Sequence, residues 1–226
     1  TPDDPQVVID RATGAEVLLT NKARVPRRAI ESLEALEFIA MLATGYDPVD
    51  VEAAAERDIP VSNVPEYASA SVAEHTFALL MELTRRTGDH DRAVQQGEWS
   101  ECPDFTFWNH PITELDGKTM GVVGWGAIGR RVGRIARGFG MEVLATTRTW
   151  RASPSWDPFE WVELAELCER SDVVTLHCPL TEQSRQMVDA ELLDAMKPGA
   201  FLINTARGEL VDEEALAAAL EAGDLG

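Results

Sequence analysis

A glycine pattern constrains the fold of this chain more than any other feature. Gly124, Gly126 and Gly129 follow a short apolar run and begin a helical pattern. In the Gly-x-Gly-x-x-Gly turn, the first glycine permits a tight turn and the second lets the backbone approach a pyrophosphate. The third lets the helix pack close to the strand, while N–H groups at the helix start face the phosphates. The predicted dinucleotide-binding residues here are Gly124, Gly126, Ala127, Ile128 and Gly129.

The sequence on both sides of the glycines matches this interpretation. Residues 119–123 read as a buried strand, and apolar residues recur at helical spacing from Ile128 to Phe139. Gly138 and Gly140 end that pattern, and residues 142–148 read as a second strand. The alternative is a glycine-rich turn in an ordinary α/β core.

The end of the second predicted strand indicates which dinucleotide is bound. Enzymes that use NAD usually place an Asp or Glu there for the ribose 2′-hydroxyl, whereas an arginine accommodates a 2′-phosphate. This chain has Thr147 and Arg148 at that place. A hydroxyl beside a guanidinium can bind phosphate through charge-assisted hydrogen bonds. The predicted cofactor is NADP or NAD, with NADP favoured; the alternative is that Arg148 is a solvated surface residue.

The charge balance of the chain is strongly acidic. Its 226 residues include 39 acidic and 20 basic ones, for a formal net charge of −19. Such a field disfavours nucleic acid and anionic membranes, so neither is an expected partner. Any anionic substrate then needs a local cationic pocket. A high-salt intracellular habitat would explain the imbalance, because salt screens the repulsion between like charges.

The chain carries no targeting or metal-binding pattern. No apolar run is long enough to span a bilayer, and no signal-peptide pattern opens the sequence. Cys102, Cys168 and Cys178 are an odd, scattered set without metal-ligand spacing. They read as free thiols in a reducing cytoplasm. We therefore expect a cytoplasmic protein with no bound metal and no cysteine nucleophile.

Predicted helices and strands alternate along the chain, which indicates parallel sheets with right-handed crossovers. The early elements are helix 6–13, strand 16–20, helix 27–33, strand 38–42, helix 50–57 and strand 60–63. A long helix then begins at Ser69 or Ser71, with an apolar face of Val72, Phe77, Leu80 and Leu83. The later elements are helix 164–169, strand 172–177, helix 190–196, strand 200–205 and a final helix capped by Asp212. We predict two α/β domains, residues 1–70 and 71–226.

Ligands of such sheets bind beyond the carboxyl ends of the strands. Four predicted strand ends carry candidate residues, at 124–129, 147–148, 178–181 and 205–208. We expect these four segments to lie along one edge of a sheet. The loop between Thr149 and Glu160 contains Pro154, Trp156 and Pro158 and has no assigned function.

Several motifs resemble those of the D-isomer-specific 2-hydroxyacid dehydrogenases, over nearly the whole chain. The resemblance is carried by residues 42–50, 63–65, 71–76, the glycine turn, 171–181 and 196–208. The last two stretches are highly diagnostic. Within the family, residues 19–22, 44–46, 97–99 and 104–105 resemble glycerate dehydrogenases, which are also hydroxypyruvate reductases.

The resemblance implies an oxidoreductase that transfers a hydride between NAD(P)H and a small 2-oxo acid. Hydroxypyruvate or glyoxylate would become D-glycerate or glycolate. It also implies a Rossmann-type doubly wound sheet in residues 71–226, a flavodoxin-like α/β substrate domain in 1–70, and an active site in the cleft between them. The position of the catalytic arginine is Arg207, the carboxylate-binding loop is Thr44, Gly45 and Tyr46, and cofactor-side positions are Cys178, Pro179, Thr205 and Ala206.

The residue at position 207 suits that role by its own chemistry. Arg207 follows a predicted buried strand, on a loop at the cofactor edge. A permanently charged, planar guanidinium can bind the carboxylate of a 2-oxo acid and polarise the carbonyl that accepts the hydride. The alternative is that Arg207 pairs with a nearby acid such as Glu209.

Other arginines and the histidines favour structural interpretations. The helix after the glycine turn carries Arg130, Arg131, Arg134 and Arg137. Cations near a helix N-terminus are unfavourable without an anion, so Arg130 or Arg131 could contact phosphate, but a solvated basic face is favoured. His177 is favoured as a structural residue over a proton carrier, and His75 as a packed residue. His90 and His110 belong to no recognisable constellation.

Carbonyl reduction also needs a proton, which the family supplies from a histidine paired with a glutamate. Their motifs are expected beyond residue 226, and the strand and helix that normally start the substrate domain are not found. The sequence therefore reads as an internal fragment lacking both ends, with little or no turnover of its own. In the full-length protein we expect a homodimer, with segment 71–99 as an interface by analogy.

Alternative functions within this fold stay open. One is a dinucleotide-sensing binding protein, like the transcriptional corepressors that share these motifs. Another is a family member that acts on a different 2-hydroxy acid, formate, phosphite or 3-phosphoglycerate. Few basic residues lie near the substrate loop, which disfavours a phosphorylated substrate.

Overall fold

The computed structural model describes residues 4–149 and 153–226, which form two compact units. The first unit ends at Ala68 and the second is Ser69–Gly226. This division falls two residues before the domain boundary predicted after residue 70. The predicted loop at 149–160 is described apart from residues 150–152, which lie outside the described residues. Of the helices that the structure describes, none combines the length and apolarity needed to cross a membrane.

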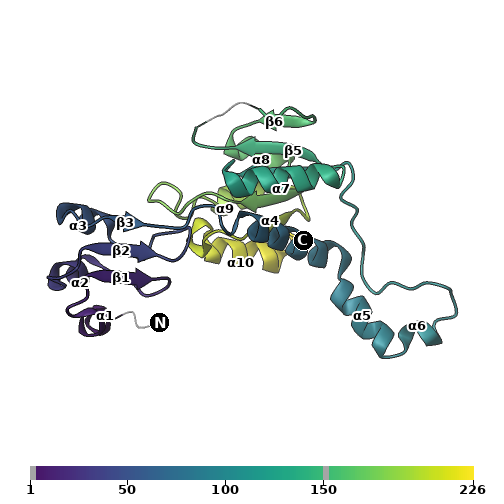
Figure 1. Cartoon of the computed structure of the whole chain (residues 1–226). Helices are drawn as coiled ribbons and strands as arrows, with labels where there is room; N and C mark the ends of the chain where they lie inside the picture. Colours follow the sequence, from purple (N-terminus) through teal and green to yellow (C-terminus); the bar gives the residue numbers. More distant parts are fainter. Residues whose placement is uncertain (1–3, 150–152) are drawn as a thin grey trace. The chain divides into compact units, whose positions relative to one another are not determined.

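The first unit contains a three-stranded parallel sheet in the order β1-β2-β3 (Figure 1). Its elements are α1 (Pro5–Ala12), β1 (Val17–Thr20), α2 (Arg27–Ser32), β2 (Phe38–Met41), α3 (Val51–Glu56) and β3 (Val61–Ser62). The side chain of Asp50 accepts a hydrogen bond from the backbone N–H of Ala53 and so caps α3. Ile30, Ile39 and Met41 are buried in the core of this unit.

The second unit is built on a five-stranded parallel sheet in the order β6-β5-β4-β7-β8 (Figure 1). Its strands are β4 (Thr119–Val123), β5 (Glu142–Thr146), β6 (Phe159–Trp161), β7 (Val173–Leu176) and β8 (Phe201–Asn204). Its helices are α4 (Ser69–Arg85), α5 (Thr87–Gln95), α6 (Glu98–Glu101), α7 (Ala127–Gly138), α8 (Leu164–Arg170), α9 (Ala190–Ala195), the short 3-10 helix η1 (Gly208–Leu210) and α10 (Glu213–Ala222). The strand order reverses between β4 and β7, which makes this a doubly wound, Rossmann-type sheet. The predicted α/β fold class is therefore confirmed.

Hydrophobic side chains cover both faces of the five-stranded sheet. Val122 packs in one cluster with Leu80 of α4 and Val132 of α7. The next residue, Val123, packs in the opposite cluster with Leu167 of α8. Successive strand residues point to opposite faces, and helices bury both faces, so the central strands are apolar along nearly their whole length.

Capping residues set helix boundaries in the second unit, and the predicted cap at Asp212 is one of them. The carboxylate of Asp189 accepts a hydrogen bond from the backbone N–H of Leu192, at the start of α9. The carboxylate of Asp212 does the same for Glu214 and Ala215 at the start of α10. That helix ends at Gly223, whose φ of 77° lies in the left-handed region.

Three local predictions are wrong. Strand β6 lies where only a loop was expected, because three residues are too few to display a period. Leu83, expected on the apolar face of α4, is exposed, and so is His75, which was expected to be packed. The buried residues of α4 include Ala73, Phe77 and Leu80, a narrow stripe that excludes both positions.

An arm formed by residues 87–113 leaves the sheet of the second unit (Figure 1). It contains α5, α6 and a loop that returns the chain to β4. Large aromatic side chains are exposed along it: Trp99 is 51% exposed, Trp108 66% and Phe105 90%. The indole N–H of Trp99 donates to the backbone oxygen of Phe105 at 3.1 Å, which ties α6 to the loop.

Candidate functional site

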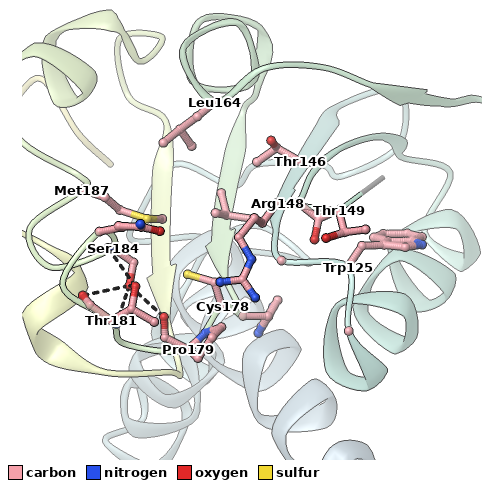
Figure 2. A pocket seen from close by; sticks show the side chains of 16 residues that line it. Trp125, Thr146, Arg148, Thr149, Leu164, Cys178, Pro179, Thr181, Ser184 and Met187 are labelled. Atoms are coloured by element: carbon pink, nitrogen blue, oxygen red, sulfur yellow. Dashed lines mark hydrogen bonds between the residues drawn. The ribbon is translucent and has the colours of Figure 1, made fainter. Parts of the chain in front are cut away.

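The segments that follow β4, β5 and β7 line one cavity of about 440 Å³ in the second unit (Figure 2). Residues 123–126 come from the end of β4, 146–149 from the end of β5, and 177–179 from the end of β7. We call this the switch-point cavity, because the strand order reverses between β4 and β7. Of the predicted site residues, it brings together Gly124, Gly126, Thr147, Arg148, Cys178 and Pro179.

The turn after β4 is shaped by close backbone contacts. Gly124 has a φ of 99°, and a Cβ on it would lie 2.6 Å from the backbone oxygen of His177. A Cβ on Gly129 would collide with the backbone oxygen of Gly124. A Cβ on Gly126 would meet no described heavy atom within 4 Å, so this glycine borders open space. The turn thus has the tight bend, the open approach and the close helix packing that a pyrophosphate requires.

Unpaired backbone N–H groups surround this open approach. Among the described residues, the N–H groups of Trp125 and Gly126 have no acceptor. Gly126 is the N-cap of α7 and offers no side chain to the first turn of the helix, where Ala127, Ile128 and Gly129 lie. The N–H groups of such a first turn have no intrahelical partner, and the helix dipole adds positive potential there. The donor set fits a diphosphate.

Thr147 and Arg148 lie at the end of β5 and line the same cavity. Figure 2 shows the side chain of Arg148 projecting among the lining residues. The described lining residues include no Asp or Glu, and Arg148 forms no ion pair with a described carboxylate. This end of the cavity therefore has a cation and hydroxyls where an NAD-binding site usually has a carboxylate.

His177 follows β7 directly and is uncharged at neutral pH. Its Nε2 lies 2.8 Å from the hydroxyl oxygen of Thr175, and its Nδ1 is buried without a hydrogen-bond partner among the described residues. Burial lowers the pKa of His177 to about 4. Burial also raises the pKa of the neighbouring Cys178 thiol, so neither residue is charged at neutral pH in this wall of the cavity.

Arg207 follows β8, the strand beside β7, at the same edge of the sheet. It does not belong to the described lining of the switch-point cavity, and neither do Thr205 and Ala206. The amide of Asn204 fixes this loop: its oxygen accepts from the N–H of Ala206 at 3.0 Å, and its nitrogen donates to the backbone oxygen of Arg207 at 2.8 Å. The hydroxyl oxygen of Thr205 lies 3.2 Å from that of Thr76 in α4.

The loop at residues 44–46 belongs to the first unit. The hydroxyl of Thr44 donates to the backbone oxygen of Val64 at 3.0 Å, and the side-chain amide of Asn63 donates to the backbone oxygen of Thr44 at 2.8 Å. Among the described residues, the backbone N–H groups of Thr44, Gly45 and Tyr46 have no acceptor. Three adjacent free N–H groups on a braced loop suit an anionic ligand.

Sequence reasoning missed several residues of these sites. Trp125 lines the switch-point cavity, and its ring packs against Phe159 at a centroid distance of 4.9 Å. Ser184 donates to the backbone oxygen of Pro179 at 2.8 Å and so braces the end of β7. Asn204 was read only as part of a motif. A small polar residue at the carboxyl end of a strand was the available signal for Asn204.

Comparisons with known proteins place the chain in a family. Residues 77–226 match the model described as D-isomer specific 2-hydroxyacid dehydrogenase, NAD binding domain. The chain belongs to the D-isomer specific 2-hydroxyacid dehydrogenase family. A hydroxypyruvate reductase of Blautia hydrogenotrophica is 41% identical over 220 residues, which cover 97% of this chain and 68% of that protein. A glycerate dehydrogenase of Methylorubrum extorquens is 38% identical over 225 residues, which cover 98% of this chain and 68% of that protein. The predicted resemblance is confirmed.

Solved structures of this family have the same fold. An acyclic imino acid reductase in complex with NADPH and D-Arg matches with a TM-score of 0.88 at 31% identity, covering 98% of this chain and 70% of that one. A D-lactate dehydrogenase of Aquifex aeolicus, complexed with NAD and lactic acid, matches with a TM-score of 0.84 at 30% identity. The match covers 100% of this chain and 65% of that one. The chain thus spans about two thirds of the length of these family members.

We predict that His177 makes the stability of the second unit depend on pH. The pKa is lowered from 6.5 to about 4 in the folded state, so the unfolded state binds more protons between these values. Stability should be complete above pH 6.5 and fall as the pH approaches 4, by up to about 3 kcal/mol from this group. Urea unfolding, followed by tryptophan fluorescence at several pH values, measures how the free energy of unfolding changes with pH.

The comparison is between His177→Gln and the exposed control His75→Gln. His177→Gln should flatten the loss of stability at acidic pH relative to the unsubstituted chain, while His75→Gln should leave it unchanged. Equal slopes for all three proteins would refute the prediction.

Proposed function

We propose that this protein reduces small 2-oxo acids with NADPH, with hydroxypyruvate or glyoxylate as substrate and D-glycerate or glycolate as product. The switch-point cavity carries this proposal, because it combines a pyrophosphate turn with a cationic, carboxylate-free end of β5. Relatives named hydroxypyruvate reductase, glycerate dehydrogenase and glyoxylate reductase support the substrate class.

Different residues of the chain would bind the cofactor and the substrate. The N–H groups around Gly126 would bind the diphosphate, and Thr147 and Arg148 would bind the 2′-phosphate. Bound NADPH would supply the hydride, and a general acid of the full-length protein would supply the proton of the product hydroxyl. Arg207 would bind the substrate carboxylate and stabilise negative charge that develops on the carbonyl oxygen. The free N–H groups of residues 44–46 offer a second carboxylate-binding element.

Replacement of Arg207 tests the proposed chemistry. Arg207→Lys keeps the charge but loses the planar fork, so kcat/KM of the full-length protein for hydroxypyruvate should fall by about a hundredfold or more. NADPH binding, measured by calorimetry, should not change. Glu209→Gln is the control, since loss of an acid beside a reactive arginine should change kcat/KM little.

With the full-length protein, NADPH oxidation is followed with hydroxypyruvate and glyoxylate, and NADP⁺ reduction is followed in parallel with formate and phosphite. Turnover restricted to formate or phosphite would refute the substrate class. Dinucleotide binding by the full-length protein without turnover of any 2-oxo acid would instead favour a sensing protein. Equal activity of Arg207→Lys and the unsubstituted protein would show that Arg207 only pairs with a neighbouring acid.

The cofactor preference depends on Arg148. Arg148→Ala removes the charge-assisted hydrogen bonds to a 2′-phosphate, so the Kd for NADPH should rise by about tenfold or more while the Kd for NADH stays within about twofold. Thr147→Asp should reverse the preference, because a carboxylate accepts from a 2′-hydroxyl and repels a phosphate. A tenfold preference of the unsubstituted chain for NADH would remove the NADP assignment.

We also propose that the protein is a homodimer and that the arm at residues 87–113 lies in the interface. Trp99, Phe105 and Trp108 expose large apolar side chains along the arm, and exposed apolar patches often mark such contacts. The double substitution Phe105→Ser and Trp108→Ser should yield single copies in analytical ultracentrifugation. The control Tyr67→Ser, at an exposed aromatic residue outside the arm, should leave the dimer intact. A monomeric unsubstituted protein would contradict this proposal.

A further inference from the structure

Helix α7 concentrates positive charge in an acidic chain. It carries Arg130, Arg131, Arg134 and Arg137 and no acidic residue. Like charges three and four residues apart repel each other on a helix surface, and cations near the N-terminus oppose the helix dipole. The chain as a whole has 39 acidic and 20 basic residues, so neutralising partners are abundant.

These four arginines nevertheless have no acidic partner among the described residues. Elsewhere the chain does pair its arginines: Arg27 bonds with Glu56, and Arg170 with Glu160 and Glu166. On α7, the contacts that these arginines form with described residues involve no carboxylate. Arg130 donates to the backbone oxygen of Trp125 at 3.4 Å, and the guanidinium of Arg137 lies 5.7 Å from the ring centre of Trp156. Internal ion pairs therefore do not explain the cluster.

Two of the arginines line a second cavity. Arg130 and Arg134 border a space of about 270 Å³ together with Trp125, Pro154, Ser155 and Trp156, and we call it the Arg130–Arg134 cavity. The two positions are four residues apart, so their side chains lie on the same face of α7. No described lining residue is acidic.

Aromatic packing fixes the wall of this cavity. The ring of Trp125 lies 4.9 Å from that of Phe159 and 5.9 Å from that of Trp161, between ring centres. Gly133 lets α7 approach this ring, since a Cβ there would lie 2.5 Å from it. Arg130 is half-buried beside this apolar wall, where charge interactions are screened less than in open water, and Arg134 is exposed at its rim.

The chemistry of this lining selects a dianion. Two guanidinium groups can each donate two parallel hydrogen bonds to a phosphate group, and the Ser155 hydroxyl adds a donor. A monocarboxylate would neutralise only one of the two charges. We propose that the Arg130–Arg134 cavity binds a phosphate dianion.

The cavity also adjoins the switch-point cavity, because Trp125 lines both. The phosphate has two possible sources: the 2′-phosphate of a dinucleotide in the switch-point cavity, or a free phosphate or phosphate monoester. The first source rests on the proposed function, whereas the second does not. The binding chemistry is the same in both.

Inorganic phosphate is the probe for the site itself. Tryptophan fluorescence of the chain, titrated at constant ionic strength, should report saturable binding because Trp125 and Trp156 line the cavity. Arg130→Gln and Arg134→Gln should each weaken binding by about tenfold, as expected for loss of a charge-assisted hydrogen-bond pair. Arg131→Gln is the matched control, with the same charge change on the same helix outside the described lining. No saturation, or equal binding by all variants, would overturn the proposal.

Calorimetry with NADPH and NADH separates the two sources. If the 2′-phosphate occupies the cavity, Arg134→Gln raises the Kd of NADPH by about tenfold and leaves the Kd of NADH unchanged. Inorganic phosphate then competes with NADPH for the site. If a free phosphate occupies it, NADPH and phosphate bind together and the Kd of NADPH does not change. Phosphate binding without any dinucleotide binding would refute the proposed function while supporting this site. Dinucleotide binding without phosphate binding would refute the phosphate site while leaving the proposed function supported.

Discussion

The close approach of backbone to backbone beneath the glycine turn determines the geometry of the second unit. Gly124 lies against the backbone of His177, and Gly129 lies against the oxygen of Gly124. These contacts join the end of β4, the start of α7 and the end of β7 without any intervening side chain. Gly126, the N-cap of α7, lines the switch-point cavity, and the position of its free N–H group follows from this packing. A side chain at either glycine would separate the strand from the helix and the N–H groups from one another.

Most of the fold could be predicted because its signals are local. The apolar run at 119–123, the capping residues Asp189 and Asp212, and Gly223 all act within a few residues of where they stand in the sequence. Strand β6 could not be predicted, since its three residues display no period and it forms only by pairing with β5. The exposure of His75 could not be predicted from the sequence either, because the packing of α4 on its neighbours decides which face of this helix is buried.

The candidate site divides in the same way. The glycine turn and the strand ends were predicted because a parallel sheet brings the carboxyl ends of its strands to one edge. The role of Trp125 was not, since nothing in its local sequence indicates that its ring meets Phe159 and Trp161. Asn204 was identified only as part of a motif, yet its amide sets the path of the backbone at Ala206 and Arg207. Residues that act by bracing others need the three-dimensional structure to be found.

The distribution of positive charge gives the acidic composition a functional meaning. In a chain with a net charge of −19, a small anion is repelled everywhere except where cations or free N–H groups gather. The structure gathers them at the first turn of α7, at Arg148 and on the face of α7 that carries Arg130 and Arg134. An arginine bound to a carboxylate, such as Arg170, stabilises the surface but offers little attraction to a ligand. The field of an arginine without such a partner is not cancelled by a neighbouring carboxylate, and the surrounding acidic surface confines that attraction to these few places.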